Sequence, residues 1–267
     1  MSDPLIIIPV QAPVQQAVFD LHSTIIDAVA ASGEALRSGD VLAVSSKYTA
    51  ISEGRVIALD DIQVTEAALA LAARYNLNPR VAQLVMNEAD HIFGGIPGFL
   101  LTAKEGIISP NAGIDRSNIP NGYAVLFPKQ PYDSARRIRA ALRERLNVDV
   151  GVILTDSWLM PGRLGTSGVA LATAGFKPIQ DERGKNDLFG NPMQVTQRGI
   201  ADSLCVCAQM VMGERDEATP LAIIRNSGVT LVDVELSAAD VAIDWRMCLY
   251  IESLTVGLLE PLNVSSS

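Results

Sequence analysis

Short apolar runs rich in β-branched residues alternate along this chain with longer segments of helical periodicity. Residues 4–11 and 40–47 are such runs and are predicted to form strands, whereas residues 19–36 between them place apolar side chains at helical spacing. A strand, a helix and a second strand in this order are typical of an α/β protein.

The alternation continues to about residue 213. Further helices are predicted over 65–75, 79–90 and 134–146, and from residue 196 until Gly213. Further strands are predicted over 99–103, 106–109, 123–128 and 150–157, with a Gly- and Pro-rich break at 93–98. The predicted fold is therefore mixed α/β, or α+β.

Length and composition bound the class of protein. With 267 residues, 48% of them hydrophobic, the chain can bury a large core, and we expect one domain over 1–267 in one or two lobes. Its apolar runs are far shorter than the roughly 20 residues of a membrane-spanning helix, and no basic stretch leads into a secretory signal. We expect no membrane partner and a cytoplasmic location.

Few soft ligands are available for a metal. The three cysteines show no zinc-type spacing and are predicted to be buried free thiols, and there are only two histidines. A metal would therefore bind through oxygen, which favours Mg²⁺ or Mn²⁺. The net charge of -9 and the lack of dense Lys/Arg runs argue against a nucleic-acid partner. An anionic small molecule would need local cations or a metal.

Two polar stretches are candidates for a site. The loop "SPNAGIDRSN" carries Asn111, Asp115, Ser117 and Asn118, more polar turn formers than a turn needs, so that either a turn alone or a bound polar ligand explains it. Asp156 ends a predicted apolar strand, where it would either cap a local turn or face a site at the strand's carboxyl end. Two carboxylates together suit a divalent cation bound to phosphate.

A third stretch, 181–213, combines a polar turn region with the last predicted helix. The turn region holds Asp181, Arg183 and Asp187. On the helix, we expect Asp202 to be solvated rather than catalytic.

Several stretches together resemble one family. They are "DVLAVSSK", "EGRV", "PNAGIDRSN", "TDS", "PGRLG", "GKNDLFGNPMQVTQRGIADSL" and "MVMGE", in order along about residues 6–225. They resemble the coenzyme F420-0:L-glutamate ligases, or γ-glutamyl ligases. The resemblance implies a mixed α/β fold, an intertwined homodimer and no added C-terminal nitroreductase-like domain. It also implies transfer of L-glutamate to F420-0, with GTP and Mg²⁺ or Mn²⁺, through an acyl phosphate. No P-loop sequence is present.

The resemblance also assigns roles to residues. It implies catalytic roles for Asp115, Asp156 and Arg163, and metal binding by Asp115, Asp156 and Ser157. The residues it implies for nucleotide binding are Pro9, Val10, Gln11, Ala12, Ser46, Lys47 and Asn118.

Three departures from the family pattern leave alternatives open. Ala50 and Ile51 replace a hydroxyl and a lysine, Met160 replaces an arginine, and Lys104 with Glu105 replaces an Arg-His pair. Each lost charge-assisted hydrogen bond is worth about 1.5 to 3 kcal/mol. A divergent metal- or nucleotide-binding paralogue without catalysis and a metal-dependent phosphohydrolase therefore stand beside the ligase. The acceptor acid, GTP over ATP, Mg²⁺ over Mn²⁺ and the number of glutamates added remain open.

Overall fold

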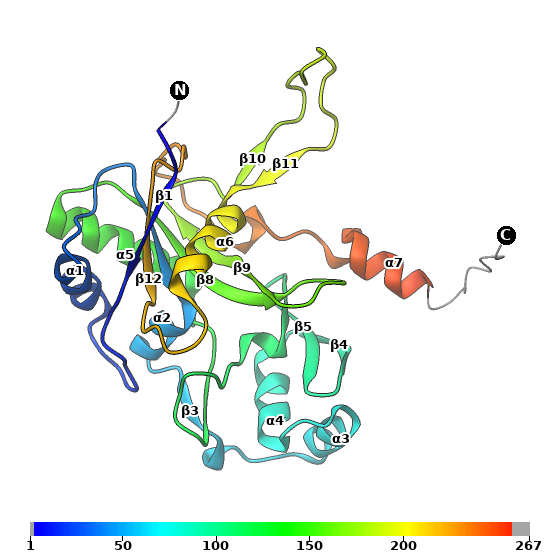
Figure 1. Cartoon of the computed structure of the whole chain (residues 1–267). Coiled ribbons are helices and arrows are strands. Elements are labelled where there is room, and N and C mark those ends of the chain that lie inside the picture. Colours follow the sequence, from blue (N-terminus) through cyan, green and yellow to red (C-terminus); the bar gives the residue numbers. More distant parts are fainter. Residues whose placement is uncertain (1–2, 258–267) are drawn as a thin grey trace.

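A five-stranded mixed sheet in the order β1-β12-β2-β8-β9 forms the centre of the larger lobe (Figure 1). The structure, a computed structural model, describes residues 3–257. Only β2 and β8 pair in parallel, and the other neighbours in this sheet are antiparallel. The mixed α/β fold expected from the sequence is confirmed.

The elements alternate along the chain as follows. The strands are β1 (Ile6–Val10), β2 (Val41–Ser45), β3 (Val56–Ala58), β4 (His91–Ile96), β5 (Phe99–Lys104), β6 (Ile107–Pro110), β7 (Tyr123–Val125), β8 (Gly151–Leu159), β9 (Thr166–Ala174), β10 (Ile179–Asp181), β11 (Gln197–Gly199) and β12 (Leu221–Arg225). The helices are α1 (Leu21–Ala31), α2 (Ser46–Ser52), α3 (Glu66–Tyr75), α4 (Pro79–Glu88), α5 (Pro131–Leu146), α6 (Ile200–Met212) and α7 (Leu249–Gly257).

Helices cover both faces of the large sheet, which explains why most side chains of its central strands are apolar. Successive side chains of a strand point to opposite faces. Leu42 and Val44 of β2 accordingly belong to the core shared with α1 and α5, whereas Val41 and Ala43 belong to the core shared with α6. Each fully buried aliphatic side chain contributes about 1.5 to 3 kcal/mol.

Residues 56–125 form a smaller lobe below the large sheet (Figure 1). It contains α3, α4, the antiparallel sheet β4-β5-β6 and the pair β3-β7. Its own core includes Leu84, Leu100 and Ala124. Within residues 3–257, no helix is long and apolar enough to cross a bilayer.

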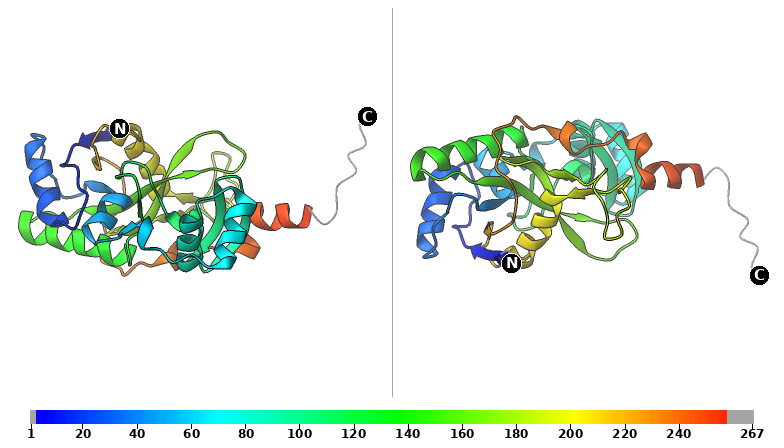
Figure 2. Two further views of the ribbon diagram at one scale, coloured as in Figure 1. Left: turned by 90° about the horizontal axis from the view of Figure 1, so that it is seen from below. Right: turned by 90° about the horizontal axis from the view of Figure 1, so that it is seen from above.

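The segment after β12 returns across the larger lobe and then leaves it. Asp233 pairs with Arg139 and Arg143 of α5, and Leu236 is buried. Ala242 lies against Gly106 at the turn between β5 and β6. Helix α7 then projects away from the body of the molecule in every view (Figures 1 and 2).

The sequence predictions were wrong at two breaks. The predicted break at 93–98 is part of the β4-β5 hairpin, where a side chain on Gly95 would come within 2.2 Å of the Phe99 carbonyl oxygen. The first helix was predicted to reach residue 36 but ends at Ala31, because Gly33 adopts a left-handed φ of 78°.

Short strands and one helix were also missed. The helix predicted from residue 196 begins at Ile200, because Gln197–Gly199 pairs with Ile179–Asp181 as a hairpin instead. The stretch after Asp156 was read as a turn, yet β8 continues to Leu159 and pairs with β9. Helix α2 directly follows β2 and was not predicted. Of the three free cysteines, only Cys205 is fully buried, whereas Cys207 and Cys248 are partly exposed.

Candidate functional site

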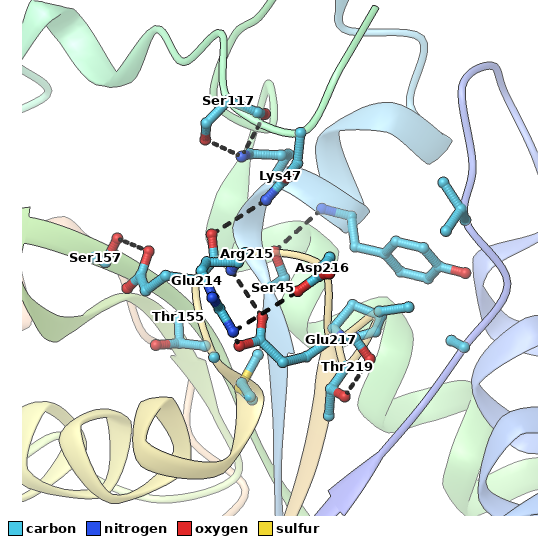
Figure 3. A pocket seen from close by; sticks show the side chains of 18 of the residues that line it. Ser45, Lys47, Ser117, Thr155, Ser157, Glu214, Arg215, Asp216, Glu217 and Thr219 are labelled. Carbon is cyan, nitrogen blue, oxygen red and sulfur yellow. Dashed lines mark hydrogen bonds and ion pairs between the residues drawn. The ribbon is translucent and has the colours of Figure 1, made fainter.

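A cavity of about 420 Å³ lies where β2 and the parallel part of β8 end together. Ser45 and Thr155 are paired at that edge, and both line the cavity. Its other walls are the segment after β1, the loop before β7 and the loop 213–220 that joins α6 to β12. Figure 3 shows side chains from these separate segments pointing into one space. Sites at the carboxyl ends of parallel strands are usual in α/β proteins.

Lys47 reaches the cavity from the first turn of α2. Ser45 ends β2 and caps the helix, since its hydroxyl accepts a hydrogen bond from the Tyr48 amide at 3.4 Å. The Thr49 hydroxyl donates to the Ser45 carbonyl at 3.2 Å. The junction between strand and helix therefore fixes the backbone from which Lys47 extends.

The polar residues of the loop 109–118 fall into two groups, one that holds the loop in place and one that lines the cavity. The side-chain oxygen of Asn111 accepts a hydrogen bond from the Leu100 backbone amide at 2.8 Å. The Asn111 side chain therefore holds the loop to β5 and does not line the cavity. Asp115 exchanges both backbone hydrogen bonds with Val125 at 2.9 Å, which fixes it beside β7. The side chains of Asp115, Ser117 and Asn118 are the ones that line the cavity.

Asp115 is held in its ionised form by its neighbours. Burial raises the pKa of its carboxyl, but the charge and hydrogen bond of Lys47 and the hydrogen bonds of Ser117 outweigh this and lower the pKa below its usual range. Lys47 Nζ lies 2.6 Å from Asp115 Oδ2, and the Ser117 amide donates to Oδ1 at 2.8 Å.

The pKa of Asp156 is shifted in the opposite direction. Burial and the nearby negative charge of Asp115 raise the pKa of Asp156 to about 6, although it accepts a hydrogen bond from the Ser157 amide at 2.8 Å. Ser46 also donates a side-chain hydrogen bond to it. Two carboxylates that interact and line one cavity favour a shared cation, which would lower the cost of ionising Asp156.

Glu214 is a cavity residue that the sequence analysis did not identify. The Ser157 hydroxyl donates to Glu214 Oε2 at 3.2 Å, and the Asn118 amide group donates to the Glu214 carbonyl at 3.3 Å. Glu214 belongs to the quoted stretch "MVMGE", but nothing in that stretch predicts that the loop after α6 returns to Ser157 (Figure 3).

The donor set suits a hard divalent cation. Within residues 3–257, no three or more His, Cys, Asp or Glu side chains cluster as a preformed metal cage. Mg²⁺ commonly binds through one or two carboxylates and completes its shell with water and phosphate. Asp115, Asp156 and the hydroxyl of Ser157 offer such a partial shell, with Glu214 beside it.

The structure places the other residues implied by the resemblance as follows. Ala12, Lys47 and Asn118 line the cavity. Pro9, Val10, Gln11, Ser46 and Arg163 are outside its lining. Val10 is fully buried, Gln11 donates to the Glu217 carbonyl at 3.2 Å, and Arg163 lies in the exposed turn between β8 and β9. The direct roles implied for these five residues stay predictions.

The three departures from the family pattern lie in different places. Ile51 lines the cavity, whereas Met160 is exposed in the turn between β8 and β9 and does not line it. Lys104 pairs with Glu88, which also binds Arg55 at 2.9 Å, so its ammonium group is held in an ion pair and does not line the cavity. Only the replacement at position 51 changes the charge of the cavity wall.

Asp202 is more constrained than expected. Although the residue is exposed, its carboxylate accepts a hydrogen bond from the Ala170 amide at 2.9 Å, next to the irregularity in the β8-β9 pairing. Its role is therefore to hold β9 to α6.

The sequence model of the family described as F420-0:Gamma-glutamyl ligase matches residues 9–226. The chain belongs to this family. Every residue that lines the cavity falls inside the match, whereas the segment 227–257 lies beyond it. The family predicted from the sequence is confirmed.

Relatives of this γ-glutamyl ligase family member span most of its length. The chain is 41% identical over 198 residues to the coenzyme F420:L-glutamate ligase of Methanopyrus kandleri, covering 74% of this chain and 78% of the relative. It is 34% identical over 214 residues to the enzyme of that name in Methanothermobacter thermautotrophicus, covering 80% and 85%. For Halobacterium salinarum, the values are 38% over 196 residues, covering 71% and 76%.

Proposed function

We propose that this chain is a ligase that adds L-glutamate to coenzyme F420-0 or a related acid, driven by GTP and a divalent metal ion. The observation that carries the proposal is the acid pair Asp115 and Asp156 beside Lys47 in one cavity. The names of the relatives, coenzyme F420:L-glutamate ligase, support the same reaction.

The proposed reaction has two steps. In the first, the substrate carboxylate attacks the γ-phosphorus of the nucleotide, the bond to the β-phosphate oxygen breaks, and an acyl phosphate forms. In the second, the glutamate amine attacks the acyl carbon, inorganic phosphate leaves, and the amine loses a proton. Such reactions depend mainly on positioning and on neutralising the charge of the phosphates.

The charge of the cavity supports the need for a metal. Its lining has five acidic side chains and two basic ones: Asp115, Asp156, Glu214, Asp216, Glu217, Lys47 and Arg215. A nucleoside triphosphate would be repelled by this surplus. A divalent cation, when bound by Asp115, Asp156 and Ser157, would supply the missing positive charge and act as a Lewis acid toward phosphate oxygens. Lys47 would hold a phosphate oxygen, and Asn118 would contact the nucleotide.

One observation favours a second candidate, a nucleotide-binding protein without ligase activity. Ile51 lines the cavity at the position where the resemblance places a lysine, and only 4% of its surface is exposed. One phosphate contact is therefore absent from the wall.

We propose further that the chain forms a homodimer through its projecting hairpin. The loop between β10 and β11 stands clear of the body (Figure 1), and Leu188 and Phe189 at its tip are 100% and 90% exposed. Hydrogen bonds from the Phe189 and Asn191 amides to Asp187, both 2.8 Å, shape the tip. Apolar side chains presented in this way are typical of protein interfaces. Replacing both Leu188 and Phe189 by Glu should convert a dimer to a monomer in multi-angle light scattering. An unchanged mass would contradict this interface.

The function is tested with the purified full chain, GTP, Mn²⁺, L-glutamate and F420-0, by mass spectrometry of the product and by phosphate release. A ligase gives one glutamylated product for each phosphate released, and ATP in place of GTP tests nucleotide choice. Phosphate release without glutamylated product would indicate a phosphohydrolase. Nucleotide binding with neither phosphate release nor product would indicate the second candidate, the nucleotide-binding protein. Asp115→Asn is the matched inactive control, because it keeps the side-chain shape and removes the charge.

A further inference from the structure

The ammonium group of Lys47 has no free hydrogen-bonding capacity in this structure. It lies 2.6 Å from Asp115 Oδ2, and it donates to the Ser117 carbonyl and to Ser117 Oγ, both at 2.9 Å. An ammonium group has three donors, so all three are used within the loop 115–117. Figure 3 shows these contacts between Lys47 and Ser117 at the cavity wall.

The carboxylate of Asp115 is correspondingly occupied. Oδ1 accepts from the Ser117 amide, and Oδ2 accepts both from Ser117 Oγ at 2.8 Å and from Lys47. A divalent ion that bound Oδ2 would meet a positive charge already in place there. Lys47 and a metal therefore compete for the same oxygen.

Lys47 and Asp115 are placed so that a metal ion can replace the ammonium group beside the carboxylate. The side chain of Lys47 is 22% exposed and that of Asp115 is 44% exposed, so both border the open cavity. Ion pairs this exposed are weak. The backbone of Lys47 is fixed at the β2-α2 junction, whereas its four-carbon stem is flexible. Only the ammonium group has to move.

We propose that Lys47 is an exchangeable internal cation, which neutralises Asp115 in the metal-free protein and is displaced into the cavity when a divalent metal binds. This inference rests on the metal-dependent function proposed above. Displacement frees the ammonium group for an anionic group in the cavity, so that metal binding prepares Lys47 to bind phosphate. Binding of the metal and binding of phosphate are then coupled through Lys47. Each is favoured when the ammonium group has left Asp115, which is the state that the other ligand produces.

Titration calorimetry of the full chain with Mn²⁺ alone tests the exchange. Lys47→Met removes the competing charge and should tighten Mn²⁺ binding by up to about fivefold, since one exposed ion pair is worth about 0.2 to 1 kcal/mol. Lys47→Gln should behave like Lys47→Met, whereas Lys47→Arg, which keeps the charge, should bind within about twofold of the unsubstituted chain. In melting experiments, Lys47→Met should melt lower than the unsubstituted chain without metal but gain more from Mn²⁺.

The outcomes separate this inference from the proposed function. If Lys47→Met and Lys47→Gln bind Mn²⁺ with unchanged affinity while Asp115→Asn loses binding, the exchange is wrong and the metal site stands. If neither the unsubstituted chain nor any Lys47 variant binds Mn²⁺, the metal-dependent function fails, and the exchange fails with it. Binding by the neutral variants alone would support the exchange directly.

Discussion

Asp156→Asn should stabilise the metal-free protein at alkaline pH. Asp156 has a pKa of about 6 in the folded chain, against 3.8 as its ordinary value, chiefly because the carboxyl is buried and then because Asp115 is near. At about 1.4 kcal/mol for each pH unit between the two values, ionised Asp156 costs at most about 3 kcal/mol of folding free energy. Asparagine carries no charge and keeps an oxygen that can accept from the Ser157 amide.

The sign of the pH dependence follows from the raised pKa. Above pH 6, Asp156 is ionised in both the folded and the unfolded chain, so the full cost is present. As the pH falls from about 6 toward 3.8, the folded chain takes up the proton first and the cost disappears. The advantage of Asp156→Asn should therefore be largest near pH 8 and about half as large at pH 5.

Thermal unfolding in the presence of EDTA, from pH 5 to 8, measures this advantage. At about 2 to 4 °C for each kcal/mol, the variant should melt up to about 6 to 12 °C above the unsubstituted chain at pH 8. Adding Mn²⁺ should reduce or reverse the difference. Asp20→Asn is a control whose effect on stability should have the opposite sign. Hydrogen bonds from Ser23 lower the pKa of Asp20, so removing this carboxylate should destabilise the folded chain most at high pH. A variant no more stable than the unsubstituted chain at pH 8 would refute the reasoning.

Three further predictions follow from the cavity and its supports. Mn²⁺ should raise the melting temperature of the unsubstituted chain but not of Asp115→Asn, and an equal rise in both would exclude Asp115 as a ligand. Ile51→Lys should tighten GTP binding in calorimetry, tenfold for about 1.4 kcal/mol regained, whereas Met160→Arg should not, because Met160 is outside the cavity lining. Equal effects would contradict the placement of these residues. Gly113→Ala should lower stability by about 1 to 3 kcal/mol in urea unfolding, because its Cβ would come within 2.1 Å of the Phe127 ring at a φ of 74°; an unchanged midpoint would contradict this packing.

The buried strands could be predicted because their apolar character is visible in a few consecutive residues. The predicted strands contain the continuous apolar runs 41–44 and 150–154, as strands covered on both faces must. Helix α2 could not be predicted in the same way. It is only seven residues long and contains Tyr48, Thr49 and Ile51, which favour strands, so tertiary packing decides its conformation.

The candidate site was predictable in part for a related reason. Asp115 and Asp156 were chosen from polar loops next to apolar strands, and the structure places both in one cavity. Glu214 was missed because its position depends on how the loop 213–220 returns from α6, which no local pattern encodes. Asn111 was grouped with the cavity residues, although its amide is used to hold β5.

Asp115 and Asp156, the two acids proposed to bind the metal, come from different lobes. Asp115 is fixed beside β7 in the smaller lobe, and Asp156 is part of β8 in the larger lobe. An ion that bound both carboxylates would therefore link the two lobes and oppose any movement that separated them. The chain after β12 also contacts both lobes, since Asp233 is held by α5 while Ala242 lies against the turn between β5 and β6. This segment is a second link between the lobes and would oppose the same separation.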